Sequence, residues 1–276
     1  MEVGKQMQFF GARVNAAKAL LYAINGGRDE VSGKQVVEGY EPIKGDGPLD
    51  FDEVWQKYEE MLDWVVGTYV EALNIIHYSH DKYAYEAVEM ALHDSNIVRS
   101  MGCGIAGLSI VADSLAAIKY AKVTPVRDET GLITDYITEG EFPFYGNDDD
   151  RADDIAATIV HTVMEKIKAI PMYRNAIPTQ SVLTITSNVV YGKATGAFPS
   201  GHKAGTPFSP GANPENGADS HGMVASMLSV GKLDYKDALD GISLTNTITP
   251  SGLGRTPEER INNLVGVLDA GFIMEK

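Results

Sequence analysis

The sequence has 276 residues, and its 38 Asp and Glu outnumber its 23 Lys and Arg, which gives a formal net charge of −15. This acidity argues against the basic surface that binds the phosphate backbone of nucleic acids. No run of about 18 apolar residues suggests a membrane span, and no signal peptide is expected. The single cysteine, Cys103, excludes an internal disulfide bond and favours a reducing cytoplasm.

The first part of the chain is predicted to be helical. Residues from Ala16 to Ala23 are mostly Ala and Leu, and Gly26 follows as a typical helix end. Asp50 and Glu53 form a pattern typical of a helix N-terminus, ahead of apolar residues at three- and four-residue spacing. These patterns predict helices over residues 5–25, 50–77, 84–100 and 103–121. The last helix is so apolar that we expect it to be buried.

The second part of the chain mixes strands, loops and shorter helices. Runs rich in β-branched residues predict a strand, turn and strand over 123–138, then strands over 181–191 and 241–248. Helices are expected over 152–169, 223–230 and 256–270. The Gly- and Pro-rich segment 192–222 should lack regular structure, and a segment that long is usually functional or flexible. The mixture indicates an α/β fold without strict alternation of strand and helix.

Residues 102–107 match the dinucleotide-binding pattern G-x-G-x-x-G. That site requires a strand before the pattern, whereas a helix is predicted there, so we favour a close junction of two helices. Cys103, inside the pattern, would open the apolar helix. Its neighbours Met101, Ile105 and Leu108 indicate an inert buried thiol rather than a reactive one.

Two further groups of residues have possible chemistry. His77, His80 and Asp81 would share one helix face, which allows a metal site, but hydrogen-bonded residues at a helix end are the favoured interpretation. Ser220 and His221 are adjacent, yet no G-x-S-x-G turn accompanies them, so triad chemistry is disfavoured. No bound metal is expected.

Arg13 is unusual in its surroundings. It follows Phe9, Phe10, Gly11 and Ala12, and such neighbours are uncommon around a purely solvated guanidinium. One interpretation is an anion site, because the planar guanidinium suits carboxylates and phosphates. The other is an exposed arginine whose stem packs along the helix.

Several longer segments resemble pyruvate formate-lyase, a glycyl radical enzyme. They are residues 3–13 (VGKQMQFFGAR), 21–27 (LYAINGG), 41–46 (EPIKGD), 72–78 (ALNIIHY), 80–83 (HDKY), 103–109 (CGIAGLS), 176–180 (AIPTQ), 187–192 (SNVVYG) and 210–214 (PGANP). Because these segments extend over nearly the whole chain, the sequence is identified as a member of this family or of its close relatives that act on 2-oxobutyrate.

The resemblance implies a ten-stranded barrel, made of two half-sheets and surrounded by long helices. Residues 1–276 would form roughly one half-barrel, helical over 1–122 and mixed over 123–276. It also implies radical cleavage of pyruvate with CoA as co-substrate, giving acetyl-CoA and formate. In this family a separate radical S-adenosylmethionine enzyme installs the glycyl radical.

The chain departs from the family pattern in three places. The paired cysteines expected shortly before Val3 and the radical motif Arg-Val-Ser-Gly-Tyr are both absent, and Ser200 to Lys203 (SGHK) stand where many members have Asp-Gly-Arg-Arg. We therefore expect a fragment that is inactive alone, carries no glycyl radical or covalent cofactor, and forms a homo-oligomer. The alternative is a stand-alone, non-catalytic binding module that keeps the fold.

Three residues take a role from the resemblance. Arg13 matches an arginine that binds the carboxylate of pyruvate, and Phe10 matches an aromatic residue on the small apolar end of that substrate. His93 corresponds to a position near the path of CoA, although an exposed helix histidine is an equally good interpretation. No catalytic residue of the family falls within the chain.

Overall fold

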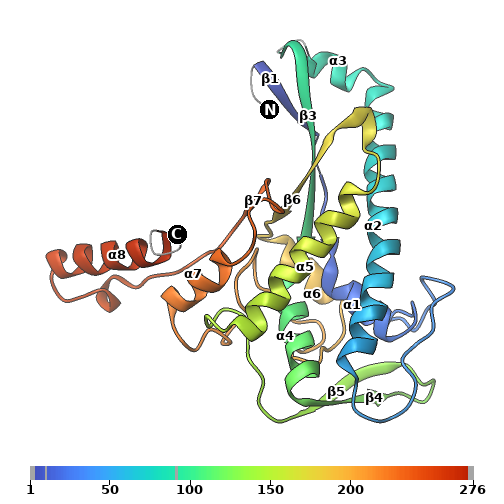
Figure 1. Cartoon of the computed structure of the whole chain (residues 1–276), viewed down its shortest axis with the longest axis vertical. Coiled ribbons are helices and arrows are strands. Elements are labelled where there is room, and N and C mark those ends of the chain that lie inside the picture. Colours follow the sequence, from blue (N-terminus) through green and yellow to red (C-terminus); the bar gives the residue numbers. More distant parts are fainter. Residues whose placement is uncertain (1–3, 10, 91–92, 273–276) are drawn as a thin grey trace.

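The computed structural model describes residues 4–9, 11–90 and 93–272. Its main sheet has five parallel strands, four of which lie in the order β1-β3-β6-β7 (Figure 1). The fifth strand, β2, pairs with β3 beyond the end of β1. These strands are β1 Gly4–Phe9, β2 Val14–Asn15, β3 His93–Ala106, β6 Ile177–Val182 and β7 Gly241–Ile242. A parallel sheet covered by helices is the α/β class that the sequence predicts.

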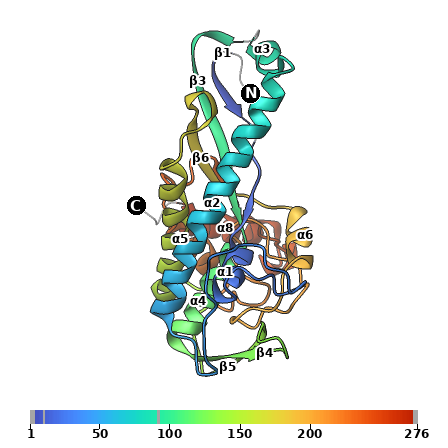
Figure 2. The ribbon, with the colours of Figure 1, turned by 90° about the vertical axis from the view of Figure 1, so that its right-hand side faces the viewer.

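The described residues form eight α-helices. They are α1 Ala16–Ile24, α2 Phe51–Asp81, α3 Tyr85–Met90, α4 Leu108–Tyr120, α5 Asp150–Lys168, α6 Ser187–Lys193, α7 Met223–Gly231 and α8 Pro257–Phe272. Figure 2 shows α5 and α6 on opposite sides of the molecule, with α2 between them. In Figure 1, α8 extends away from the rest of the chain beside α7. None of the helices in the described residues is both long and apolar enough to cross a membrane.

Several predicted elements are confirmed. Asp50 caps α2 by accepting the N–H of Glu53, and Asp149 caps α5 in the same way through the N–H of Arg151. The strand–turn–strand prediction corresponds to an antiparallel hairpin of β4 Lys122–Arg127 and β5 Ile133–Glu139. The helices expected at 223–230 and 256–270 are α7 and α8, and 192–222 contains only the end of α6 and no other regular element.

Two predicted helices are wrong over most of their length. Residues 4–9 are a strand and only 16–24 are helical, while residues 93–106 form β3 instead of a helix. β1 and β6 pair with β3 along the sheet, so hydrogen bonds to distant segments outweigh the local helix preference of these residues. The predicted strand at 181–191 is also wrong in part, because β6 ends at Val182 and α6 begins at Ser187. The first 122 residues thus contain strands as well as helices.

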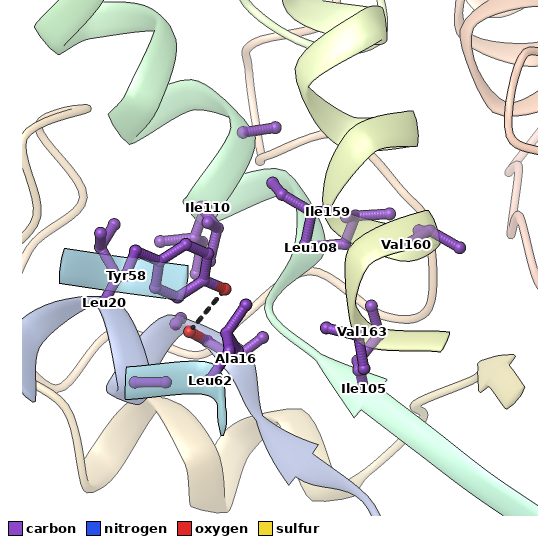
Figure 3. Packing of buried hydrophobic residues seen from close by; sticks show 14 of the residues in the cluster. Ala16, Leu20, Tyr58, Leu62, Ile105, Leu108, Ile110, Ile159, Val160 and Val163 are labelled. Atoms are coloured by element: carbon purple, nitrogen blue, oxygen red, sulfur yellow. Dashed lines mark hydrogen bonds between the residues drawn. The ribbon is translucent and has the colours of Figure 1, made fainter. Parts of the chain in front are cut away.

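The core lies where α1, α2, α4 and α5 meet the carboxyl end of β3 (Figure 3). Every residue of α4 from Leu108 to Ile118 is buried, as its apolar sequence predicts. Tyr58 of α2 is fully buried, and its hydroxyl donates to the carbonyl oxygen of Ala16 at 3.2 Å. This bond satisfies the one polar atom of the tyrosine side chain, and it ties the start of α1 to α2.

Candidate functional site

A cavity of about 250 Å³ lies on the main sheet, between the end of β1, the middle of β3, β6 and the residue before β7. Its lining includes Gln8, Arg13, Gly102, Cys103, Ser181 and Asp240. Four segments that are far apart in the sequence therefore meet around one small space. Arg13 is among the lining residues, so the guanidinium singled out from the sequence faces a cavity and not only bulk water.

Arg13 lies in the irregular link between β1 and β2, not within a helix as predicted. Glycines allow this link to approach β3 closely. A Cβ built at Gly11 would lie 1.2 Å from the carbonyl oxygen of Gly102, and one built at Gly104 would lie 2.9 Å from Cγ of Arg13. Larger residues at either glycine would push the link, and the arginine with it, away from the sheet.

Two tyrosines hold the backbone beside Arg13. The hydroxyl of Tyr69 on α2 donates to the carbonyl oxygen of Ala12 and accepts the N–H of Gly104 at 3.1 Å. The hydroxyl of Tyr191 on α6 donates to the carbonyl oxygen of Arg13 at 3.5 Å. The position of the arginine is thus fixed by its main chain, through contacts with two different helices.

The side chain of Arg13 has fewer hydrogen-bond partners than its backbone would suggest, because one of its donors is left without an acceptor among the described residues. Its Nε atom is buried and has no hydrogen-bond partner among the described residues. A buried donor without an acceptor is costly, and a guanidinium presents paired donors that match a carboxylate. The arrangement therefore suits the binding of a small carboxylate in the cavity.

Cys103 and Asp240 are the other ionisable residues in the lining of the Arg13 cavity. Burial raises the pKa of the Cys103 thiol to about 12, an effect that the Tyr69 hydroxyl opposes and the charge of Asp240 reinforces. The raised pKa favours the protonated thiol at neutral pH, and Cys103 is buried as the sequence predicts. Asp240 is held by a hydrogen bond that its carboxylate accepts from the side-chain amide of Gln8. The cavity lining thus includes a cation and an anion but no ionised nucleophile.

Of the other two residues with a role from the resemblance, only His93 can be placed relative to this cavity. Phe10 lies outside the described residues. His93 opens β3, where its Cα pairs with that of Gly4, rather than lying on a helix. Ten residues of extended strand separate it from Cys103, a distance of roughly 30 Å. His93 and the Arg13 cavity are therefore separate places in this fold.

Residues 102–107, which match the G-x-G-x-x-G pattern, do not form the predicted junction of two helices. Residues 102–106 are the end of β3. Gly107 follows with a φ of 84° and is the N-cap residue of α4. Gly102 and Gly104 lie inside the strand, beside the cavity, where absent side chains leave room for Gln8 and Arg13. Gly102 and Gly104 are two residues apart, so in a strand both lie on the same face of the sheet. This spacing was the signal in the sequence that could have indicated a strand in close contact with another segment.

Among the described residues, neither of the two predicted histidine groups forms a cluster of metal ligands or a catalytic triad. The carboxylate of Asp81 accepts hydrogen bonds from the hydroxyl of Tyr173 and from Nε of Arg174, both at 2.6 Å. The rings of His77 and His80 lie edge to face, with 5.9 Å between their centroids. Ser220 donates to the side chain of Asn147, and no bond between Ser220 and His221 is present among the described contacts.

The described residues hold one group of three possible metal ligands, formed by His161, Glu165 and Asp237. The group is largely exposed, and His161 and Asp237 are already joined at 2.7 Å. Lys168 lies 2.8 Å from Glu165 and 3.5 Å from Asp237. An ammonium group therefore stands where a metal ion would have to bind.

Sequence comparison finds two family models on the chain. The model described as "Pyruvate formate lyase-like" matches residues 1–192, and the model described as "Glycine radical" matches residues 208–276. The second match was not predicted, because the motif Arg-Val-Ser-Gly-Tyr does not occur in the sequence. Formate acetyltransferase 1 of Escherichia coli (strain K12) is 59% identical over 272 residues, which are 99% of this chain and 36% of that protein.

Solved structures with the same fold are glycyl radical enzymes. A glycyl radical enzyme from Archaeoglobus fulgidus has a TM-score of 0.77 at 23% identity, over 94% of this chain and 35% of its own. The B12-independent glycerol dehydratase from Clostridium butyricum has a TM-score of 0.81 at 23% identity, over 99% of this chain and 37% of its own. The curled parallel sheet is thus the half-barrel that was expected, and the chain spans about a third of these relatives. With two models covering almost its entire length, the chain belongs to the pyruvate formate lyase-like family of glycyl radical enzymes.

Proposed function

We propose that this chain forms the oxo-acid-binding part of a formate acetyltransferase, which converts CoA and pyruvate into acetyl-CoA and formate. Residues 1–276 act in this proposal as one partial barrel domain. Arg13 binds the carboxylate of the oxo acid, Phe10 packs on its small apolar end, and His93 lies along the path of CoA. The 59% identity to a formate acetyltransferase supports the reaction.

The observation that carries this proposal is the buried, unpartnered Nε of Arg13 beside a cavity of about 250 Å³. A planar guanidinium can donate two parallel hydrogen bonds to one carboxylate, which fixes the direction of the adjacent carbonyl group. The Tyr69 and Tyr191 hydroxyls keep the arginine backbone in place while the ligand enters. Orientation of the keto acid is therefore the contribution that this part of the enzyme makes.

The protonated thiol of Cys103 is not the attacking group in this proposal. The attacking cysteine pair and the radical glycine belong to the remainder of the family pattern, and the glycyl radical depends on a radical S-adenosylmethionine activating enzyme. We further propose a homo-oligomer acting in the cytoplasm during anaerobic sugar fermentation. Alone, the chain should not turn over, and measurable exchange between formate and pyruvate by the isolated anaerobic protein would contradict this.

Titration of pyruvate into the protein, followed by calorimetry, tests the binding role. Pyruvate should bind, and Arg13→Gln should weaken binding about tenfold or more, because a hydrogen bond to a charged group contributes about 1.5–3 kcal/mol. The matched control is Arg28→Gln, since Arg28 bonds Thr130 on the surface and lies outside the cavity lining. If the original protein, Arg13→Gln and Arg28→Gln bound pyruvate with equal affinity, Arg13 would not be part of the binding site. Repeating the titration with 2-oxobutyrate distinguishes the two substrate classes.

A further inference from the structure

A second cavity, of about 530 Å³, lies under the Gly-rich segment and shares no lining residue with the Arg13 cavity. Its lining includes Asp113 of α4 and Phe144. It also includes His202, Lys203 and Glu215 of the Gly-rich segment. A cavity of this volume is of the size that holds a small organic ligand.

Two carboxyl oxygens in the wall lack a hydrogen-bond partner among the described residues. They are Oδ2 of Asp113 and Oε1 of Glu215, and both atoms are buried. Asp113 as a whole is 0% exposed, and its Oδ1 accepts the N–H of Tyr145 at 2.7 Å. Buried carboxyl oxygens almost always receive a donor, so two without one in the same cavity indicate a missing donor group.

The protein itself supplies no cation to these two oxygens. The ring of His202 is already used, since Nδ1 lies 2.8 Å from Oε2 of Glu215 and Nε2 lies 3.2 Å from the carbonyl oxygen of Thr206. Lys203 is exposed and makes no described ion pair with either acid. Burial, with the charges of Glu215 and Asp153 in addition, raises the pKa of Asp113 well above its usual value. In the empty cavity Asp113 therefore holds a proton more readily than an ordinary aspartate, whereas a bound cation would favour its ionised form.

We propose that this cavity binds a small organic cation of the guanidinium or amidinium class, whose N–H groups donate to Oδ2 of Asp113 and Oε1 of Glu215. A planar cation presents several donors in one plane, so it can serve two carboxyl groups at once, whereas an ammonium group is a compact point charge. Phe144 also lines the cavity, and an aromatic ring attracts a nearby guanidinium group. The net charge of −15 favours the approach of cations in general.

Calorimetric titration with ethylguanidinium tests the proposal, and ethylammonium serves as the probe with charge but no planar fork. Ethylguanidinium should bind at one site per chain and at least about tenfold more tightly than ethylammonium. Asp113→Asn and Glu215→Gln should each weaken binding about tenfold or more. Glu215→Gln also covers the case in which the change at the buried Asp113 prevents folding.

Asp219→Asn is the matched control, because Asp219 is exposed nearby and does not line the cavity. It removes one negative charge and should leave the affinity unchanged. His202→Arg would carry its own guanidinium into the cavity, and it should abolish binding of the probe while raising the melting temperature. Absence of saturable binding to the unmodified protein, or equal weakening by all three acid-to-amide changes, would overturn the proposal. Pyruvate binding by Glu215→Gln should remain normal, so this test is separate from that of Arg13.

Discussion

The two cavities of this protein have opposite unsatisfied groups. The cavity on the sheet contains a buried nitrogen of Arg13 without an acceptor, and the cavity under the Gly-rich segment contains buried oxygens of Asp113 and Glu215 without a donor, among the residues that the structure describes. The sign of the missing partner therefore differs, an anion in the first and a cation in the second. Unpartnered buried atoms are thus more informative about a ligand than the size of a cavity.

The cavities also differ in how their walls are built. The Arg13 cavity has walls of paired strands, and glycines bring these strands together. The second cavity has one wall on α4 and the other on an irregular segment. A strand wall is fixed by a ladder of hydrogen bonds, whereas a loop wall depends on individual side-chain contacts such as that between His202 and Glu215. We therefore expect the first cavity to be the more rigid of the two.

The largest expected effect concerns the rigidity of the Arg13 cavity, measured through Cys103. Its pKa of about 12 lowers the thiolate fraction at neutral pH by about 10³ relative to an ordinary thiol with a pKa of about 8.5. Alkylation of the native protein by iodoacetamide should therefore be at least about 10³ times slower than alkylation of the unfolded chain. The combined variant Cys103→Ser, Ser32→Cys moves the thiol to an exposed loop and should react at the ordinary rate. Fast alkylation of native Cys103 would mean that this cavity opens readily, which would break the comparison.

A smaller effect is expected from the glycine that brings the Arg13 link to β3. Gly11→Ala places a methyl group against the carbonyl oxygen of Gly102, so the free energy of unfolding should fall by about 3 kcal/mol. Gly67→Ala is the matched control inside α2, where the new methyl group meets nothing within 4 Å. That change should raise the free energy of unfolding by about 0.5–1 kcal/mol. Denaturant titration of both variants measures the difference, and similar values would show that close approach at Gly11 is unimportant.

The smallest effect concerns the acidic wall of the second cavity. Because burial raises the native pKa of Asp113 above the value of about 3.9 in an unfolded chain, the folded protein retains a proton that the unfolded chain loses. Stability should then fall as the pH rises above about 4, until the raised native pKa is reached. Asp113→Asn removes this dependence. It should lie within about 1 kcal/mol of the original protein at pH 4 and gain relative to it at higher pH.

Three neighbours of Asp113 need to be considered in that experiment. Glu215 and Asp153 act on Asp113 through their charges, and Tyr145 donates its backbone N–H to the carboxyl group. Glu215→Gln separates the contribution of the other acidic residue that lines the cavity. A stability difference between Asp113→Asn and the original protein that does not change between pH 4 and pH 8 would contradict the raised pKa.

Local patterns predicted those elements whose signal lies within the element itself. The cap at Asp50, the apolar spacing along α2 and the turn between β4 and β5 are short-range signals, and these elements occur as expected. β3 was missed because its partners, β1 and β6, are far from it in the sequence. A strand between two others gains most of its stability from such distant partners, which no local window contains.

The candidate site shows the same division. Arg13 could be found from its apolar neighbours and from the family resemblance. Ser181 and Asp240, which line the cavity, and Tyr69, which holds the backbone beside it, could not be found in this way, because each comes from a different part of the chain. The orphaned oxygens of Asp113 and Glu215 were equally hidden, since a missing hydrogen-bond partner is a property of the folded chain alone.

The sequence by itself determined the family, the charge and the strongly capped helices, and it singled out Arg13 as a candidate for binding an anion. Tertiary structure decided that residues 4–9 and 93–106 are strands, that burial raises the pKa of the Cys103 thiol, and that two cavities contain, among the described residues, buried groups of opposite sign without a partner. The physical reason is the range of the interactions. Caps and helical spacing act within a few residues, whereas parallel pairing, burial and desolvation depend on segments brought together only by folding.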